Sequence, residues 1–316
     1  MKPCLLRSAA FIASLAPPLA ANAQSGADYR VQNASIQEQA NGVLALMAFS
    51  VVPDLNTSAL SITNASSGNP GLRMIQFGGG FTWSKATPLY LEGALGFSHY
   101  DPTFVVSNGR SAESVPTKWT SFSGTGGIGW DFPLTDNLKL RPILDFTLGY
   151  VTSNILLGNW DRQAKSGADL RFLGEGTLQA AGIGGALMLD YEHYRDDGEV
   201  DVELRYTDIR LQSIGGSQAV QGHAKAQTAS AWARWRAPTG LTALQRPLRY
   251  VLEGAHSAYL GSQAGALGFN RLSSLGAGLE FDSSAYDAYV TRTRLIVRHA
   301  FGENISGYSL SIAMSF

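Results

Sequence analysis

The chain ends with the stretch Gly307-Tyr308-Ser309-Leu310-Ser311-Ile312-Ala313-Met314-Ser315-Phe316. Large apolar side chains occupy one parity of this stretch, and glycine, serine or alanine occupies the other. Because successive side chains of a β-strand point to opposite faces, the stretch predicts a strand with one apolar and one small, polar face. An amphipathic edge strand of a soluble sheet would show the same alternation, so this stretch alone does not identify the kind of sheet.

A terminal aromatic residue preceded by alternating apolar residues resembles the insertion signal of bacterial outer-membrane β-barrels. The residues that carry the resemblance are Tyr308, Leu310, Ile312, Met314 and Phe316. The resemblance implies that the barrel-assembly machinery reads this strand during insertion.

The same alternation recurs from residue 55 onward. In one segment, for example, Ile75, Phe77 and Phe81 share a face. Such segments are about as long as the tilted strands that cross a bilayer in a barrel. The pattern predicts twelve strands, at residues 55–64, 73–83, 89–98, 122–132, 138–150, 177–190, 199–211, 225–237, 248–260, 271–281, 287–301 and 307–316.

The connections between these segments support a barrel. With Phe316 in the periplasm, the three longest connections, 100–118, 152–176 and 212–224, all fall outside the cell. Outer-membrane barrels have short periplasmic turns and longer external loops, whereas a soluble sandwich has no reason for one-sided loops. We therefore predict an all-β fold, a 12-stranded antiparallel transmembrane β-barrel over residues 54–316.

The first residues predict export. Lys2 and Arg7 precede an apolar stretch, and Ala21-Asn22-Ala23 forms a cleavage site, so residues 1–23 are predicted to be a signal peptide. The apolar stretch is too short to span a bilayer, which needs about 20 residues. Cys4 leaves with this segment, and the predicted mature chain has no cysteine.

Composition limits the kinds of membrane protein that this chain could be. Charged residues make up 16% of the chain, and no apolar run is long enough for a spanning helix. A closed sheet is the remaining way to cross a bilayer with every backbone group satisfied. No basic stripe points to nucleic acid, and no cluster of histidine, cysteine or carboxylate residues points to a metal or another cofactor.

The segment 24–53 is predicted to contain a helix in the barrel lumen. Ser35 and Glu38 have capping-box spacing, and Pro53 ends the helix at Val52. Its length of roughly 25 Å would match the apolar band of a barrel. Residues 43–52 are apolar nearly all round, however, which does not suit a purely polar lumen, and an additional strand is the alternative.

Aromatic residues near strand ends are expected to form interfacial girdles. Trp83, Trp130, Phe132 and Trp235 lie near periplasmic ends, and Trp119 lies near an external end.

Charges on the parity opposite the apolar face are expected to line the lumen, because charge on the lipid face is costly. A ladder of three arginines, Arg292, Arg294 and Arg298, would bias an open pore toward anions. A paired network that stiffens a narrow lumen around the helix is the favoured interpretation. The predicted lumen-lining residues are Arg141, Arg205, Arg234, Arg236, Arg292, Arg294, Arg298, Glu92, Asp145, Glu203, Glu253 and Glu280.

A helix directly before a twelve-stranded barrel with a terminal aromatic strand resembles the translocator domain of autotransporters. Only about 30 residues of the predicted mature chain precede the barrel, so the chain resembles solitary, passenger-free members. The resemblance implies a monomeric integral protein of the cell outer membrane whose helix threads a narrow or plugged pore. Its partners would be outer-membrane lipid, including lipopolysaccharide, and the barrel-assembly machinery.

Several functions remain open from sequence. The barrel would act as a pore or as a scaffold for surface loops such as 152–176, and we expect no enzymatic activity. A membrane-embedded lipid hydrolase would need serine beside histidine and an orienting group, yet His256 and Ser257 point to opposite faces. A barrel that cleaves its own lumenal helix would do so at Asn41-Gly42. The sequence identifies no solute or ligand.

Overall fold

The computed structural model describes residues 11–13, 36–54, 59–62, 71–101, 103–107, 112–155, 177–216, 222–282, 291–303 and 305–315. It contains one helix, α1 (Ile36–Val51), within these residues. The strands are β1 (Phe11–Ala13), β2 (Ala59–Ile62), β3 (Gly71–Thr82), β4 (Leu89–Asp101), β5 (Thr103–Ser107), β6 (Ala112–Trp130), β7 (Phe132–Pro133), β8 (Leu138–Ile155), β9 (Thr177–Tyr194), β10 (Glu199–Gly216), β11 (His223–Ala243), β12 (Arg246–Gly261), β13 (Arg271–Asp282), β14 (Arg292–Gly302) and β15 (Ile305–Ser315).

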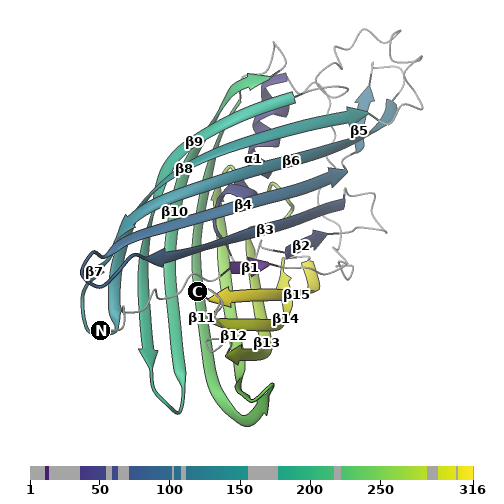
Figure 1. Cartoon of the computed structure of the whole chain (residues 1–316). Coiled ribbons are helices and arrows are strands. Elements are labelled where there is room, and N and C mark those ends of the chain that lie inside the picture. Colours follow the sequence, from purple (N-terminus) through teal and green to yellow (C-terminus); the bar gives the residue numbers. More distant parts are fainter. Residues whose placement is uncertain are drawn as a thin grey trace.

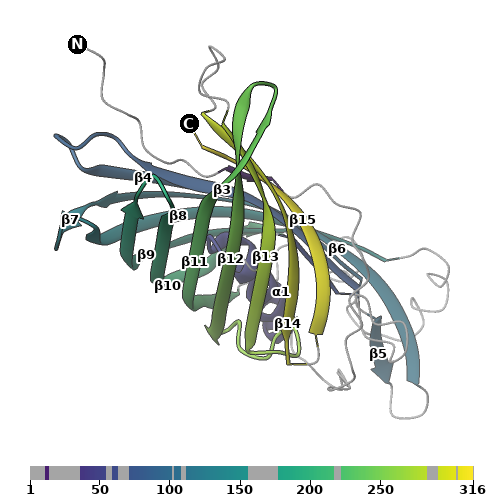
Figure 2. The same cartoon turned by 90° about the horizontal axis from the view of Figure 1, so that it is seen from below.

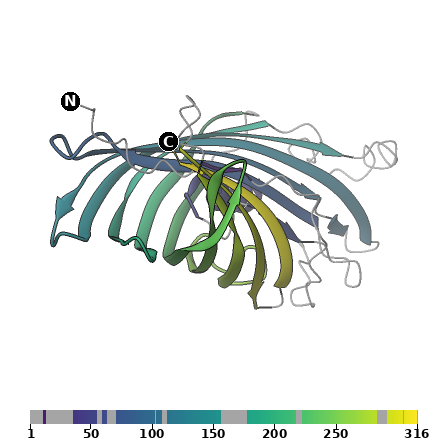
Figure 3. The same ribbon diagram turned by 60° about the horizontal axis from the view of Figure 1, so that its bottom comes forward.

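The strands form one antiparallel sheet that follows chain order (Figure 1). Its order is β1-β15-β14-β13-β12-β11-β10-β9-β8-β6-β4-β3-β2, with β5 paired to β6 and β7 paired to β8. The sheet twists and curls around α1, as the views from below show (Figures 2 and 3). This meander confirms the predicted antiparallel barrel fold.

The two edges of the sheet approach each other. β1 lies beside β3, and β15 lies beside β2, although no backbone ladder in the described part of the chain joins β15 to β2. The edge of β15 is instead occupied by β1, which pairs Phe11 with Met314. β1 falls within the predicted signal peptide, so removal of that segment would leave this edge of β15 open.

Alternation along the strands gives the sheet an apolar outer face and a buried inner face. On β8, Leu144, Phe146 and Leu148 are 46%, 51% and 65% exposed on the outside. Between them, Asp145 and Thr147 are buried on the inside. Each of the twelve predicted segments coincides with a strand of the structure, although 55–58, 63–64, 287–290 and Phe316 lie outside the described residues. The prediction of twelve alternating strands is thus confirmed.

α1 lies inside the curved sheet, with strands β4, β6, β8, β10 and β11 around it (Figure 2). The helical prediction for residues 43–52 is therefore correct and the strand alternative is wrong. Ser35 of the predicted capping box lies outside the described residues. Within the described ranges, α1 is too short to qualify as a membrane-spanning helix.

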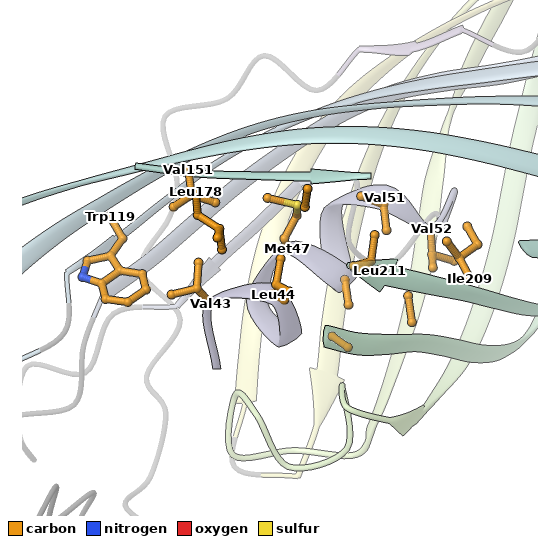
Figure 4. Close-up of a cluster of buried hydrophobic side chains, with 14 residues drawn as sticks. Val43, Leu44, Met47, Val51, Val52, Trp119, Val151, Leu178, Ile209 and Leu211 are labelled. Carbon is orange, nitrogen blue, oxygen red and sulfur yellow. The ribbon is translucent and has the colours of Figure 1, made fainter. Parts of the chain in front are cut away.

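Apolar wall residues surround α1 on two sides. The first cluster joins Leu44, Met47 and Val51 of the helix to Trp119 and Leu211 of the wall (Figure 4). The second cluster joins Phe49 of the helix to a different set of strands. Its wall members are Leu72, Met74, Tyr259, Phe269, Leu272 and Ile305. A helix that is apolar nearly all round is thus accommodated, because this half of the lumen is apolar as well.

One aromatic expectation is wrong. Trp119 is only 6% exposed and packs in the cluster around α1, not at a lipid interface. On β6 the outward parity is that of Phe122 and Trp130, and Trp119 has the opposite parity. Trp83, Phe132 and Trp235, in contrast, are exposed near the short turns, as expected.

The helix approaches the wall closely at two glycines. A Cβ at Gly149 would lie 2.2 Å from Met47 Sδ, and a Cβ at Gly96 would lie 2.6 Å from the Ser50 carbonyl oxygen. The second contact involves helix backbone, which cannot move aside without shifting the helix. Gly96 therefore fixes how near the wall the C-terminal turn of α1 can lie.

We expect Gly96→Ala to lower the free energy of unfolding by about 1–3 kcal/mol, because the added methyl overpacks the helix contact. Gly126→Ala is the matched control, since a Cβ there meets no atom within 4 Å. The measurement is the urea midpoint of the refolded full chain. Equal midpoints for the two variants would contradict the close helix contact.

Candidate functional site

The C-terminal turn of α1 is held by side chains of the barrel wall. The last four carbonyls of a helix have no partner within the helix. Here Thr125 Oγ1 donates to the Val51 carbonyl at 2.7 Å, and Gln263 Nε2 donates to the Ala48 carbonyl at 3.3 Å. Gln76 Nε2 serves two further carbonyls, those of Ser50 at 3.0 Å and Val52 at 2.8 Å. Wall donors therefore replace the water that would cap an exposed helix end.

Asp54 anchors the chain just after the helix. Its backbone N–H donates to Gln76 Oε1 at 3.3 Å. Its carboxylate accepts from Ser257 Oγ at 2.8 Å and from Tyr259 Oη at 2.9 Å. The Tyr259 ring in turn lies 4.9 Å from the Phe49 ring, so one wall residue contacts both the helix and its anchor.

A cavity of about 570 Å³ lies between the end of α1 and the short turns of the barrel. Its lining includes Asp54 at the helix end and Lys85 and Asn137 in the short turns. Charged and aromatic side chains from opposite walls, such as Arg141 and Trp232, complete it. The lumen is thus divided into an apolar half filled by α1 and a polar half with open volume.

Arg205 and Arg141 form buried ion pairs on one side of the polar half of the lumen. Arg205 Nη1 and Nη2 donate to the two oxygens of Glu92 at 2.8 and 2.6 Å. This bidentate pair joins β10 to β4, which the sheet separates by β9, β8 and β6. Arg141 donates to Asp131 through Nε and to Asp190 at 2.9 Å through Nη2. Both arginines are buried, so each carboxylate supplies charge compensation that water cannot.

The other side of the polar half carries a larger network. Arg236 contacts Glu280 at 3.3 Å and Asp201 at 3.0 Å. Arg294 also contacts Glu280, at 3.1 Å. The network continues through Arg234 with Asp201, Arg298 with Glu253 and Ser311, and Arg249 and Arg292 with Glu199. Arg236 with Glu280, Arg298 with Glu253, and Arg249 and Arg292 with Glu199 join strands that are not neighbours, whereas the other pairs join adjacent strands, and together they brace the polar half of the lumen.

The charges predicted from parity to line the lumen all lie on inward positions. Within the described residues every one of them forms an ion pair except Glu203, which faces the cavity. The three arginines of the ladder are each paired with a glutamate. Sequence reasoning missed Asp190, Glu199, Asp201 and Arg249, although the same parity rule applied to β9, β10 and β12 would have found them.

The terminal strand follows its predicted parity as far as the structure describes it. Tyr308 is 56% exposed on the outside, whereas Ser311 is buried inside. Leu310 and Ile312 share the side of Tyr308. The Met314 side chain and Phe316 lie outside the described residues.

Two histidine–serine contacts bear on a hydrolytic function. His256 Nδ1 lies 2.8 Å from Ser273 Oγ, and His299 Nε2 lies 3.0 Å from Ser306 Oγ. Both pairs lie on the outer face, and no carboxylate or amide completes either pair within the described ranges. In those ranges, no group of three or more metal-ligating residues occurs either.

The asparagine considered for self-cleavage is far from the charge network. Asn41 Oδ1 accepts a hydrogen bond from the backbone N–H of His223, at the long-loop end of β11. The charged half of the lumen begins beyond Asp54, at the opposite end of the helix. The structure therefore does not bring Asn41 together with the network's carboxylates.

Gln76 is the capping residue whose loss we expect to matter most. Gln76→Met keeps the volume but removes the donor to the Val52 carbonyl, one of two donors to the Ser50 carbonyl and the acceptor of the Asp54 N–H, so stability should fall by about 1–3 kcal/mol. Gln212→Met, at an exposed outward position, is the matched control. Urea unfolding of both full-length variants checks this. A control as destabilised as the Gln76 variant would refute the capping role.

The Arg205–Glu92 pair should behave as a buried unit. Arg205→Met alone leaves the buried carboxylates of Glu92 and Asp145 without their arginine and should cost about 3–5 kcal/mol. Adding Glu92→Leu should restore part of this loss, since only Asp145 then lacks the arginine. Lys85→Met, in an exposed turn, should change stability by less than about 0.5 kcal/mol. A double-mutant cycle measures the coupling, and strictly additive losses would show that the pair is not coupled.

Part of the sequence matches a known protein family. Residues 20–155, less than half of the chain, match the family model described as "Autotransporter beta-domain". No curated protein matches the sequence. The β-domain of the Bordetella autotransporter BrkA is 15% identical with a TM-score of 0.45, covering 78% of this chain and 91% of that chain.

Two further solved structures are similar at the same low level. The translocator domain of NalP from Neisseria meningitidis is 12% identical with a TM-score of 0.44, covering 78% of this chain and 80% of that chain. The transport unit of AIDA-I from Escherichia coli is 10% identical with a TM-score of 0.45, covering 92% of this chain and 99% of that chain. Residues 20–155 therefore resemble an autotransporter β-domain, and the chain as described folds as one antiparallel sheet around an internal helix.

Proposed function

We propose that this protein is an integral outer-membrane barrel that α1 keeps closed, a plugged pore whose long loops are displayed at one end. The observation that carries this proposal is the capping of the α1 carbonyls by Gln76, Thr125 and Gln263. A helix that merely passed through a wide pore would leave these groups to water.

Burial of the helix supports the same conclusion. Leu44, Phe49 and Val51 are 0% exposed, so no solvent layer separates α1 from these wall contacts. Burial of a side chain of this size contributes about 1.5–3 kcal/mol, and several act together here. Opening the lumen would therefore require several apolar contacts to break at once.

The paired arginines argue against a steady anion channel. An anion pore needs cations whose charge faces the permeating ion. Arg294 and Arg298 instead contact Glu280 and Glu253. We therefore assign the charge network a bracing role in a barrel that works as a monomer and needs no enzymatic chemistry.

The outer face supports the proposed membrane placement. Leucine, valine and aromatic side chains dominate the outward positions of the strands, including Leu148, Leu275 and Val297 at 65%, 62% and 55% exposure. A water-soluble protein rarely exposes so continuous an apolar band. Together with the predicted signal peptide, this band supports insertion into the outer membrane by the barrel-assembly machinery.

A disulfide between helix and wall tests the closed state. Met47 Cγ lies 3.5 Å from the position of a Cβ at Gly149, so Met47→Cys with Gly149→Cys places a thiol near its partner. We expect the refolded wild-type chain without residues 1–23 to show almost no single-channel conductance in a planar bilayer. The oxidised variant should stay closed in mild urea, whereas the reduced variant should open.

Met47→Cys with Gly126→Cys is the control, because Gly126 faces outward and has no helix atom within 4 Å. Its conductance should be the same under oxidising and reducing conditions. Steady conductance by the wild-type chain, unaffected by oxidation of the Met47–Gly149 variant, would show an open pore and overturn the proposed function.

A further inference from the structure

Basic side chains gather on the outer face at the long-loop end of the barrel. Arg210 on β10 and Lys225 on β11 are directly opposite each other in the ladder, and both are exposed on the outside. Directly opposed residues have Cβ atoms about 4.5–5.5 Å apart, and like charges in such positions repel. Neither side chain has a hydrogen bond or ion pair within the described residues.

More basic side chains lie on the outer face in the long-loop halves of other strands. Arg271 begins β13, and His256 on the neighbouring strand lies 2.8 Å from the Ser273 hydroxyl. We call the whole set the basic girdle. It consists of Arg73, Lys118, Arg210, Lys225 and Arg271 with the histidines His99, His223, His256 and His299.

The opposite end of the same face has a different composition. Its outward strand positions carry apolar or aromatic side chains such as Trp83, Trp130 and Trp235. Among described strand residues, His193 on β9 and Arg246 at the tip of the β11–β12 hairpin are the basic exceptions there. Among the described strand residues, basic charge on the outer face is therefore concentrated at the long-loop end.

Acidic residues compensate this charge only in part. Asp101 contacts His99 at 3.0 Å, and Asp208 accepts from Gln227 at 2.8 Å. Glu303 in the β14–β15 turn accepts from the backbone N–H of Asn270 at 3.1 Å. Among the residues whose side chains are described, the five lysine and arginine residues of the girdle thus exceed the acidic side chains on this part of the face.

We propose that the basic girdle binds the phosphate groups of phosphorylated lipid headgroups in the membrane leaflet at the long-loop end. Lysine and arginine at a membrane boundary extend their charged ends toward the headgroups and keep their methylenes in the apolar region. A phosphate between Arg210 and Lys225 would turn a repulsive pair into two attractive contacts. Arginine also matches phosphate geometry with two parallel donors.

This proposal rests on the proposed membrane placement and adds a lipid preference to it. The headgroup chemistry is common to lipopolysaccharide and anionic phospholipids. Each basic side chain near an anionic surface contributes about 1 kcal/mol, which corresponds to about a fivefold preference. The girdle would hold the barrel at a fixed height in the bilayer and favour one leaflet for the long loops.

The test uses the full chain without residues 1–23, refolded into vesicles of phosphatidylcholine alone or mixed with phosphatidylglycerol. Insertion is read from the heat-dependent gel mobility of the barrel. Lipid preference is read from the fraction of spin-labelled phosphatidylglycerol, relative to spin-labelled phosphatidylcholine, that the protein immobilises. We expect Arg210→Gln with Lys225→Gln to lower this preference at least about fivefold without preventing insertion.

Lys85→Gln with Arg195→Gln is the control, because it removes the same charge from exposed turns at the other end. It should leave the lipid preference near the wild-type value. Equal losses in both variants, or no loss in either, would overturn the proposed site. If inorganic phosphate protects the wild-type barrel against heat unfolding on the gel as well as phosphatidylglycerol does, the girdle is a free-anion site instead. Failure to insert into any vesicle would overturn the membrane placement itself.

Discussion

The structure depends on one requirement, that the backbone carbonyls at the C-terminal end of α1 find donors inside the barrel. A buried carbonyl without a partner costs about 1–3 kcal/mol, and a helix end presents four of them. Gln76 on β3 and Thr125 on β6 supply donors from the wall, and Gln263 supplies one from the connection after β12. The helix, the strands and one connection are therefore stabilised together, and the depth of the helix in the lumen is fixed by where these donors lie.

This arrangement divides the lumen into two environments. Around α1 the inward positions are apolar, as at Val151 and Leu211, and packing excludes water. Beyond Asp54 the inward positions are charged, and the ion pairs of Arg205 and Arg236 join strands that are not neighbours in the sheet. Buried ion pairs add little stability compared with apolar packing, but removing one partner is costly, so the network favours a single barrel shape. A closed lumen follows from packing at one end and bracing at the other.

Strand alternation and turn spacing were sufficient to predict the twelve strands, because lipid outside and a filled lumen inside impose opposite chemistry on the two parities. The helix was predictable from Pro53 and its apolar length. The error at Trp119 came from ranking proximity to a strand end above parity, which assigns this residue to the inside. The capping contacts were not predictable, since Gln76 and Gln263 meet carbonyls that are 26 and 215 residues away in sequence.

The most direct test of a barrel closed by α1 is hydrogen–deuterium exchange of the full chain in a lipid bilayer. It is followed by mass spectrometry of the peptides that cover residues 43–52. We expect these amides to exchange as slowly as those of β9 and β10, because nearly all side chains of this stretch are buried and the end of α1 is capped by the wall. Exchange as fast as that of exposed loops would show that the helix leaves the lumen freely, and it would contradict a closed barrel.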